Sequence, residues 1–513
     1  MKKILTRALA LTIAAAMLIP IAGCGKKDDI ASDDANTITY WCALGSNESQ
    51  AVHNRRDSEL AKKIMEETGV NIKFEHPAGG NAQEKFNVMV AMGKYPDIIE
   101  YNWTSYDGGI EKAIEDGIIK PIDLKNDAPN LYAYVQENPE IEKWLKTDNG
   151  DYYGWPFIRG DRYLLTSAGL IMRKDLLDKY GLEVPETIDD WTETLRTFKK
   201  NGIASPLCLT SWGINLGAFI GAYDTYSKLY VRDGKVIFGP MEDSYKDFLT
   251  QMNAWYEEGL MDPDYASLDN TIIQSKILNN EAGAAFGACG GMLGKWLNAA
   301  SGDFDLVGTK YPTLNPGERN EFGHCDSQVY TSDIAVISAT TEKFDLAKKV
   351  LDYGYSEEGR MLFNFGIEGK SYNMVDGYPT YTEEIVNNPD GLSMGVALAK
   401  YALAQDMGPF IQDRRYMEQY AKLPQQKQAL EIWSDTNMAE HILPPVNLTA
   451  EQQKELAPLL DVLQTKVDEW QTKFIMGVEP MSNFETYRKE LKGLGIDKYV
   501  QYMQEAYDRF NER

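Results

Sequence analysis

The chain has few residues of the kinds from which metal sites and disulfide frameworks are built. Its 513 residues include five cysteines and four histidines. Beyond a cysteine in the N-terminal leader, Cys42, Cys208, Cys289 and Cys325 are spaced widely and irregularly, without a C-x-x-C pair. Neither a metal knot nor a disulfide framework is indicated. We expect these four cysteines to be buried thiols. In an oxidising compartment, one disulfide between two of them is the alternative.

The chain also lacks the common catalytic signatures. It contains no G-x-S-x-G and no H-E-x-x-H sequence. Gly369-Lys-Ser371 ends like a phosphate-binding loop, but Asn364 stands where the first glycine is required. The histidines are far apart in sequence: His53, His76, His324 and His441. We therefore expect no enzyme activity, no cofactor and no metal ion.

Positive charge is scarce. Asp and Glu number 77 against 52 Lys and Arg, which gives a formal charge of −25. A surface of this sign repels phosphate backbones and anionic lipid headgroups. Nucleic-acid binding is disfavoured, and any membrane attachment must come from something other than surface charge.

The N-terminus carries an export signal. Lys2, Lys3 and Arg7 precede an apolar run over residues 8–20, which is too short to span a bilayer comfortably. The run ends in Ile21-Ala-Gly-Cys24, which resembles the bacterial lipobox, although an ordinary signal containing a cysteine is the alternative. We expect residues 1–23 to be a signal peptide and Cys24 to be acylated. Residues 24–36 are a polar tether, and the protein is held by lipid alone at the outer face of the membrane.

Strand-like and helix-like patterns alternate after the tether. Strands are expected at 37–42, 70–74 and 96–101, and helices at 55–68 and 83–92. This alternation is typical of a parallel α/β sheet, whose ligands lie beyond the carboxyl ends of the strands. Trp41, Asn102 and Trp103 would then lie on one rim.

Six stretches resemble one known family. They are Tyr153-Gly-Trp-Pro-Phe157, residues 169–182, Val184-Pro-Glu-Thr-Ile-Asp-Asp-Trp191, Asp333-Ile-Ala-Val-Ile337, residues 364–372 and Gln504-Glu-Ala-Tyr-Asp-Arg-Phe510. In order and spacing they resemble the extracellular solute-binding proteins of family 1, the sugar-capturing components of ATP-driven importers. With the lipobox, the resemblance runs along the whole chain.

The resemblance implies an α/β, two-lobed, type II periplasmic-binding-protein-like fold with interleaved lobes, a hinge and a helical C-terminal segment. Carried onto this sequence, lobe 1 is 37–158 plus 328–372, and lobe 2 is 159–327 plus 373–513. The hinge crossings then fall near 157–167, 325–330 and 371–378. A monomer would capture a carbohydrate, an oligosaccharide in particular, in the inter-lobe cleft and pass it to the permease subunits of an ABC transporter.

The tryptophans divide into two groups, and aromatic faces are what sugar C–H surfaces stack on. The first group has apolar partners at helical spacing and is expected in the core: Trp144, Trp191, Trp255, Trp433 and Trp470. The second follows strand-like runs among small polar residues and is expected to contact ligand: Trp41, Trp103, Trp155 and Trp212. Gly291 and Trp296 lie in a stretch that resembles a ligand-contacting turn of the family, and Trp296 fits core and ligand equally.

Polar ligand contacts are expected from side chains at rim or hinge positions, since a saccharide needs both donors and acceptors. The candidates are Asn102, Arg159, Asp161 and Asp326, each of which also fits a solvated loop residue. Asp148-Asn-Gly-Asp151 lacks calcium-loop spacing and is interpreted as a turn, although some relatives hold calcium in a comparable loop.

Two other functions stay open on the residues alone. A secreted lipoprotein glycosidase would also use aromatic platforms, together with two carboxylates about 5 to 10 Å apart. A binding protein for a peptide is the other alternative, which the tryptophan-rich rim disfavours.

Overall fold

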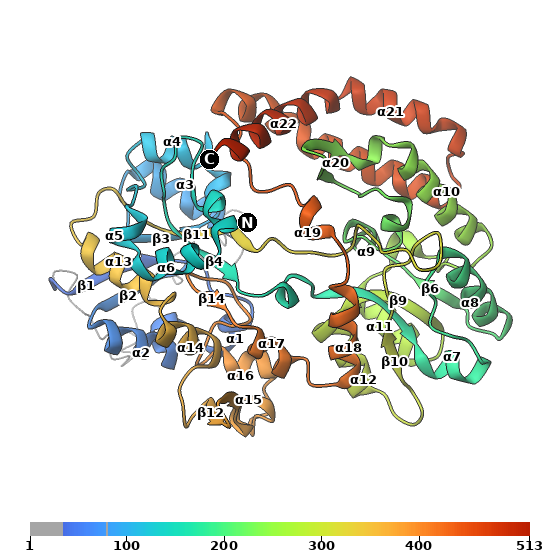
Figure 1. Cartoon of the computed structure of the whole chain (residues 1–513), viewed down its shortest axis with the longest axis horizontal. Coiled ribbons are helices and arrows are strands. Elements are labelled where there is room, and N and C mark those ends of the chain that lie inside the picture. The colour runs from blue at the N-terminus through green and yellow to red at the C-terminus, as the bar shows by residue number, and fades with distance from the viewer. Residues whose placement is uncertain (1–33, 78–80) are drawn as a thin grey trace, which may run out of the picture.

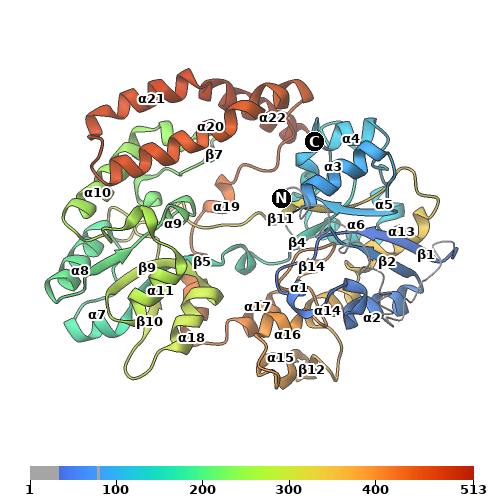
Figure 2. The same ribbon diagram turned by 180° about the vertical axis from the view of Figure 1, so that it is seen from behind.

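A computed structural model describes residues 34–77 and 81–513 (Figure 1). The predicted signal peptide, Cys24 and most of the tether lie outside the described residues. Two α/β lobes lie side by side, and several stretches of chain pass between them (Figures 1 and 2). Among the described residues, no helix is long and apolar enough to cross a membrane.

Lobe 1 is built on a mixed sheet in the order β14-β4-β11-β3-β1-β2. Its strands are β1 (Thr37–Trp41), β2 (Asn71–Glu75), β3 (Ile98–Tyr101), β4 (Trp155–Arg159), β11 (Val329–Ile337) and β14 (Ile411–Gln412). β1 runs parallel to β2 and β3, whereas β11 runs antiparallel to β3 and β4. β11, which returns from the other lobe, therefore lies between β3 and β4, and the expected two-lobed α/β fold is confirmed.

Helices cover both faces of this sheet. On one face α2 (Glu59–Thr68), α6 (Pro129–Glu137), α13 (Phe344–Tyr353) and α14 (Glu357–Phe365) pack over Ile38, Tyr40 and Ile72. On the other, α3 (Ala82–Met92) and α4 (Gly109–Glu115) pack over Ile99 and Tyr101. Shorter helices complete the lobe: α1 (Glu48–Ala51), α5 (Leu124–Asp127), α15 (Glu383–Val386) and α16 (Met394–Leu398). Side chains from both faces of these strands are consequently buried.

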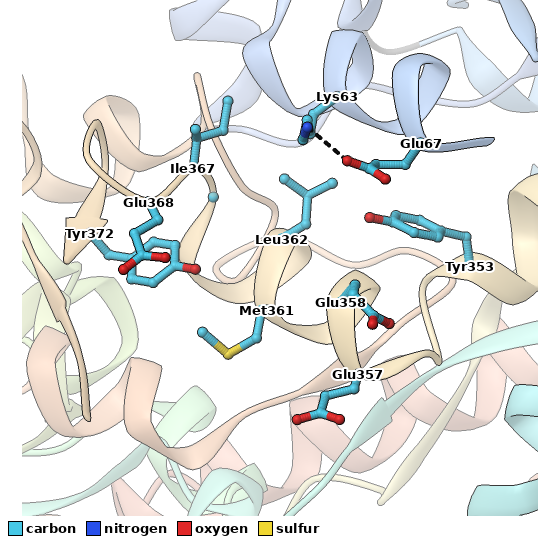
Figure 3. A pocket seen from close by; sticks show the side chains of 11 residues that line it. Lys63, Glu67, Tyr353, Glu357, Glu358, Met361, Leu362, Ile367, Glu368 and Tyr372 are labelled. Atoms are coloured by element: carbon cyan, nitrogen blue, oxygen red, sulfur yellow. Dashed lines mark ion pairs between the residues drawn. The ribbon is translucent and has the colours of Figure 1, made fainter. Parts of the chain in front are cut away.

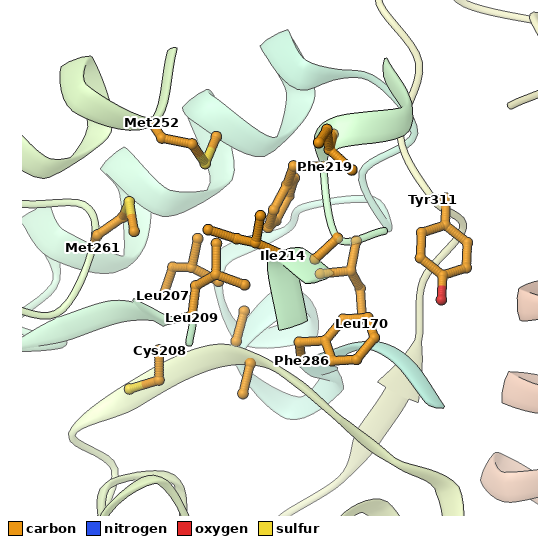
Figure 4. Packing of buried hydrophobic residues seen from close by; sticks show 14 of the residues in the cluster. Leu170, Leu207, Cys208, Leu209, Ile214, Phe219, Met252, Met261, Phe286 and Tyr311 are labelled. Carbon is orange, nitrogen blue, oxygen red and sulfur yellow. The ribbon is translucent and has the colours of Figure 1, made fainter. Parts of the chain in front are cut away.

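Lobe 2 has a smaller mixed sheet, in the order β10-β5-β9-β6, with strands β5 (Ala168–Arg173), β6 (Ser205–Cys208), β9 (Ala282–Ala288) and β10 (Leu306–Gly308). Leu170, Leu207, Ile214 and Phe286 meet in its core (Figure 4). Its helices are α7 (Lys174–Tyr180), α8 (Ile188–Lys200), α9 (Ser211–Asn215), α10 (Asp243–Glu257), α11 (Asn270–Leu278), α12 (Lys295–Ala299), α18 (Pro424–Trp433) and α19 (Met438–His441), beside the hairpin of β7 (Leu229–Arg232) and β8 (Lys235–Phe238).

The last hinge crossing lies later in the chain than expected. Residues 372–381 form a hairpin, β12 (Tyr372–Val375) and β13 (Tyr378–Tyr381), around Asp376 and Gly377. Both turn residues have positive φ, as an Asp-Gly turn of the I′ type requires, so the chain folds back on itself instead of leaving the lobe.

Residues 373–412 therefore stay on lobe 1, because β14 pairs with β4 and Phe410 and Ile411 join the lobe 1 core. The chain crosses through α17 (Arg414–Tyr420), and α18 then packs on the lobe 2 strands β5 and β10. The prediction of a crossing at 371–378, with 373–412 in lobe 2, is wrong for this reason.

The expected helical C-terminal segment comprises α20 (Ala450–Ile475), α21 (Phe484–Gly493) and α22 (Ile496–Glu512). It packs on α10 and β8 of lobe 2 and reaches across to lobe 1. There Asp148 accepts hydrogen bonds from the guanidinium groups of Arg509 and Arg513. The 148–151 segment is a turn, and both arginines bind the carboxylate of Asp148.

Candidate functional site

One edge of the lobe 1 sheet collects the ends of most of its strands. β1, β3, β4 and β14 all finish there, and the antiparallel β11 starts there, as the pairing of Ile334 with Tyr101 shows. The chain leaves for lobe 2 from the same edge, after Arg159. Ligands of α/β sheets bind outside the carboxyl ends of the strands, so this edge is where a ligand is expected.

A matching edge belongs to lobe 2. β5 begins at Ala168, directly after the first crossing, and β6 and β9 run so that they finish at that same edge. Trp212 follows β6 and Gly291 follows β9. Since the crossing from Arg159 to Ala168 joins the two edges, they flank the hinge, and the space between them is the candidate site.

Three of the tryptophans predicted to contact ligand lie in the core of lobe 1. Trp103 and Trp155 are 0% exposed and Trp41 is nearly buried. Trp41 packs against Tyr101 and Phe86, and Trp103 donates a hydrogen bond from its indole N–H to the Ile334 carbonyl. In this conformation the three rings are largely inaccessible to a ligand, because helices cover both faces of the sheet and bury the side chains at its strand ends.

On lobe 2, Trp296 is also 0% exposed and belongs to the core, so its ligand interpretation is excluded in this conformation. Trp212 differs. Its side chain is 42% exposed and its ring rests edge-on against Phe286, with 5.3 Å between ring centroids. Gly291 is exposed as well, with open space where a β-carbon would stand. Of the four tryptophans predicted to contact ligand, Trp212 is therefore the one whose ring is exposed enough for a ligand to stack on it.

The tryptophans predicted to be core are placed as expected. Trp191, Trp255 and Trp433 are fully buried and Trp470 almost so. Trp144 is half-buried and stands edge-on to Phe510 of α22, at the contact between lobe 1 and the C-terminal helices. Apolar partners at helical spacing were a sound signal for the core.

The predicted polar contacts make bonds within the protein. Asn102 and Asp161 each accept a backbone N–H two residues on, from Thr104 and Tyr163, and so cap short helical turns. Arg159 donates to the Ser327 carbonyl at 2.7 Å and lies 3.5 Å from the Asp326 carboxylate. Arg159 and Asp326 thus tie the first hinge crossing to the second, and all four residues lie at or beside the lobe 1 edge.

The sequence interpretation missed a cavity of about 300 Å³ at this edge. Its lining comprises Ala43, Leu44, Gly45, Arg55, Glu100, Asp333, Gln405, Asp406 and Met407. The first three follow β1, Glu100 lies in β3 and Asp333 lies where β11 is bulged. Convergent polar groups in a concavity at strand ends are typical of a ligand site.

Two carboxylates of this cavity have no internal partner. Among the described residues, none donates a hydrogen bond to or forms an ion pair with the carboxylate of Asp333 or Asp406. Burial raises the pKa of each of these two carboxyls to about 6. Both side chains are half-buried, so their oxygens are free to accept hydrogen bonds from a group that enters the cavity. Hydroxyl groups of a ligand would donate such bonds.

Arg55 organises the floor of the cavity. It donates two hydrogen bonds to Glu48, at 2.7 and 2.9 Å, and lies 3.8 Å from Glu100, which also accepts a bond from the Tyr40 hydroxyl. Burial opposes ionisation of Glu48, but the Arg55 guanidinium holds the pKa of Glu48 below its usual value. Burial raises the pKa of Glu100 to about 7, although Arg55 opposes this shift.

The raised pKa of Glu100 predicts a pH-dependent stability. An unfolded glutamate titrates near pH 4.3. The folded state therefore binds a proton more tightly, and this stabilising contribution is complete below about pH 4 and lost as the pH rises through about 7. Glu100→Gln should remove that loss, so the melting temperature of the wild type should fall relative to the variant between pH 5 and 8. Parallel melting curves across this range would contradict the assignment.

A second, larger hollow of about 590 Å³ lies on lobe 1 away from the strand ends (Figure 3). It is formed by α2, α13 and α14 and carries Glu357, Glu358 and Glu368, while Lys63 is paired with Glu67 at 2.7 Å. It brings together none of the predicted site residues, and we assign it no ligand.

Two α/β lobes, joined by crossings that leave facing sheet edges, with a polar cavity at one edge, define a solute-binding protein. The sequence profile of the bacterial extracellular solute-binding protein family matches residues 53–361. This chain belongs to that family.

Comparisons with individual relatives extend this match over most of the chain. Lipoprotein LipO of Bacillus subtilis is 27% identical over 77% of this chain and 79% of its own. The fructooligosaccharide ABC transporter substrate-binding protein FusA of Streptococcus pneumoniae is 23% identical over 96% of both. A solved HMO-binding, ABC-transporter-associated solute-binding protein of Bifidobacterium longum infantis matches in fold with a TM-score of 0.75, covering 93% of this chain and 99% of its own at 19% identity.

Proposed function

We propose that this protein captures a carbohydrate, most fittingly an oligosaccharide, between its lobes and delivers it to an ABC importer. The observation that carries the proposal is the cavity at the lobe 1 edge, where the Asp333 and Asp406 carboxylates receive no hydrogen bond from any residue that the structure describes. On the opposite edge, Trp212 offers an exposed aromatic face. Acceptors on one wall and a ring on the other match the hydroxyls and C–H face of a sugar.

The relatives support the same ligand class, because FusA is described as a fructooligosaccharide ABC transporter substrate-binding protein.

We also propose that the protein is exported, acylated at Cys24 and attached by lipid to the outer face of the cell membrane. There it would act as a monomer that contacts the permease subunits. LipO is a lipoprotein by name. Mass spectrometry of the native N-terminus tests the anchor, and an unmodified Cys24 or a retained Met1 would contradict it.

Catalysis is the alternative that the cavity itself brings forward. Carboxyls with raised pKa values in one concavity are also what glycosidases use. We propose binding without turnover, because Glu100 is engaged by Tyr40 and Arg55 and because FusA is described as a substrate-binding protein.

A ligand screen tests the function. With kestose, raffinose or stachyose at a hundred times its dissociation constant, a bound sugar should stabilise the protein by about 2.7 kcal/mol. Chromatography after long incubation should recover the sugar intact. Cleavage products would support the glycosidase, and stabilisation by oligopeptides instead of sugars would support a peptide-binding protein.

A further inference from the structure

The cavity at the lobe 1 edge holds more negative than positive charge. Glu100, Asp333 and Asp406 line it, against one cation, Arg55. That cation is not available, since Glu48 engages its guanidinium at two nitrogens and the Arg55 side chain is only 6% exposed. A ligand carboxylate placed here would meet carboxylates without a free guanidinium to receive it.

Two further arginines near this edge are paired with carboxylates. Arg159 is tied to Asp326 and to the Ser327 carbonyl. Arg414 is paired with Glu418 at 2.8 Å and lies 3.6 Å from Asp161. Among the described residues that line the cavity, Arg55 is the one arginine, and it is paired, so bidentate recognition of an anionic sugar there lacks its usual partner.

The acceptors, in contrast, are unfilled. Glu100 is 92% buried and uses one oxygen for Tyr40 and Arg55, while its other oxygen accepts no hydrogen bond from the described residues. Asp333 and Asp406 accept no hydrogen bond from residues 34–77 or 81–513. Above about pH 6 the Asp333 and Asp406 carboxylates can take up several hydroxyl donors, and hydrogen bonds to charged acceptors are stronger than neutral ones.

We infer that the sugar residue entering this cavity is uncharged and rich in hydroxyls, and that Asp333 and Asp406 exclude uronic acids from it. The inference rests on the proposed function and adds the charge class of its ligand. Like charges at close range in a partly desolvated site repel strongly, so rejection of a carboxylate should amount to a hundredfold or more in affinity.

The test compares neutral and anionic oligosaccharides of similar length by calorimetry. Kestose and stachyose serve as neutral probes, and oligogalacturonate and alginate oligomers as anionic ones. We expect binding of a neutral probe at least a hundredfold tighter than that of either uronate. Equal or tighter binding of a uronate would overturn the inference and leave carbohydrate capture standing. Binding of no saccharide, neutral or anionic, would overturn both.

Variants assign the effect to the cavity. In the double variant Asp333→Asn/Asp406→Asn, affinity for the neutral probe should fall tenfold or more. The ratio between the affinities for the neutral probe and for oligogalacturonate should fall by a similar factor. The amides keep the shape and remove two half-buried negative charges that have no ion-pair partner among the described residues, so the variant should melt no lower than the wild type. Asp345→Asn is the control, because its side chain is 86% exposed on α13. An equal change of selectivity in this control would overturn the inference.

Discussion

Trp155→Ala is expected to lower the free energy of unfolding of lobe 1 by about 3–5 kcal/mol. The indole is 0% exposed and packs in the core beneath β4, where removing it leaves a cavity that the two helix-covered faces cannot close. Denaturant melts followed by circular dichroism would measure the loss.

Sugar affinity is the matching control for this variant. Under conditions where Trp155→Ala stays folded, its affinity for a neutral oligosaccharide should be close to that of the wild type. Unchanged stability with a large loss of affinity would place Trp155 at the ligand and contradict the structure. Because the chain has two lobes, the melt is to be analysed for more than one transition.

Trp212→Ala is expected to do the reverse. Its ring is 42% exposed at the lobe 2 edge and rests on Phe286, so little core is lost on truncation. If a sugar stacks on it, removing the aromatic face costs about 1–3 kcal/mol of binding free energy, which raises the dissociation constant about five- to hundredfold. Calorimetry with the sugar found in the ligand screen measures this.

Trp212→Phe is the matched variant, since it keeps an aromatic face of smaller area. We expect its affinity to lie between those of the wild type and Trp212→Ala, with melting temperatures of all three within a few degrees. A Trp212→Ala protein that binds sugar as tightly as the wild type would remove Trp212 from the site.

The comparison of Trp155 with Trp212 shows where sequence reasoning stopped. Both follow apolar, strand-like runs and stand among small polar residues, so their local patterns are alike. What separates them is their place in the fold. Trp155 lies in β4, under helices α6 and α13, whereas Trp212 lies in the first turn of α9, beyond the end of β6.

The acidic cavity shows the same limit. Asp333 opened a stretch quoted for the family resemblance, but it lies within β11, where the strand is bulged, and no local pattern marked the bulge. Asp406 carried no such signal, because its segment was assigned to lobe 2. Only the pairing of β14 with β4 brings residues 405–407 to the edge where β1 and β3 finish.

By itself, the sequence determined the α/β class, the two-lobed architecture and the membership in a family of extracellular solute-binding proteins, because these follow from periodicities and from motifs whose order is preserved along the chain. It also identified the helical core tryptophans, whose partners are three or four residues away. The tertiary structure decided which aromatic ring is exposed, where the last crossing lies and which carboxylates share a cavity. Those depend on contacts between residues hundreds of positions apart, and no local pattern records whether a side chain finds a neighbour there.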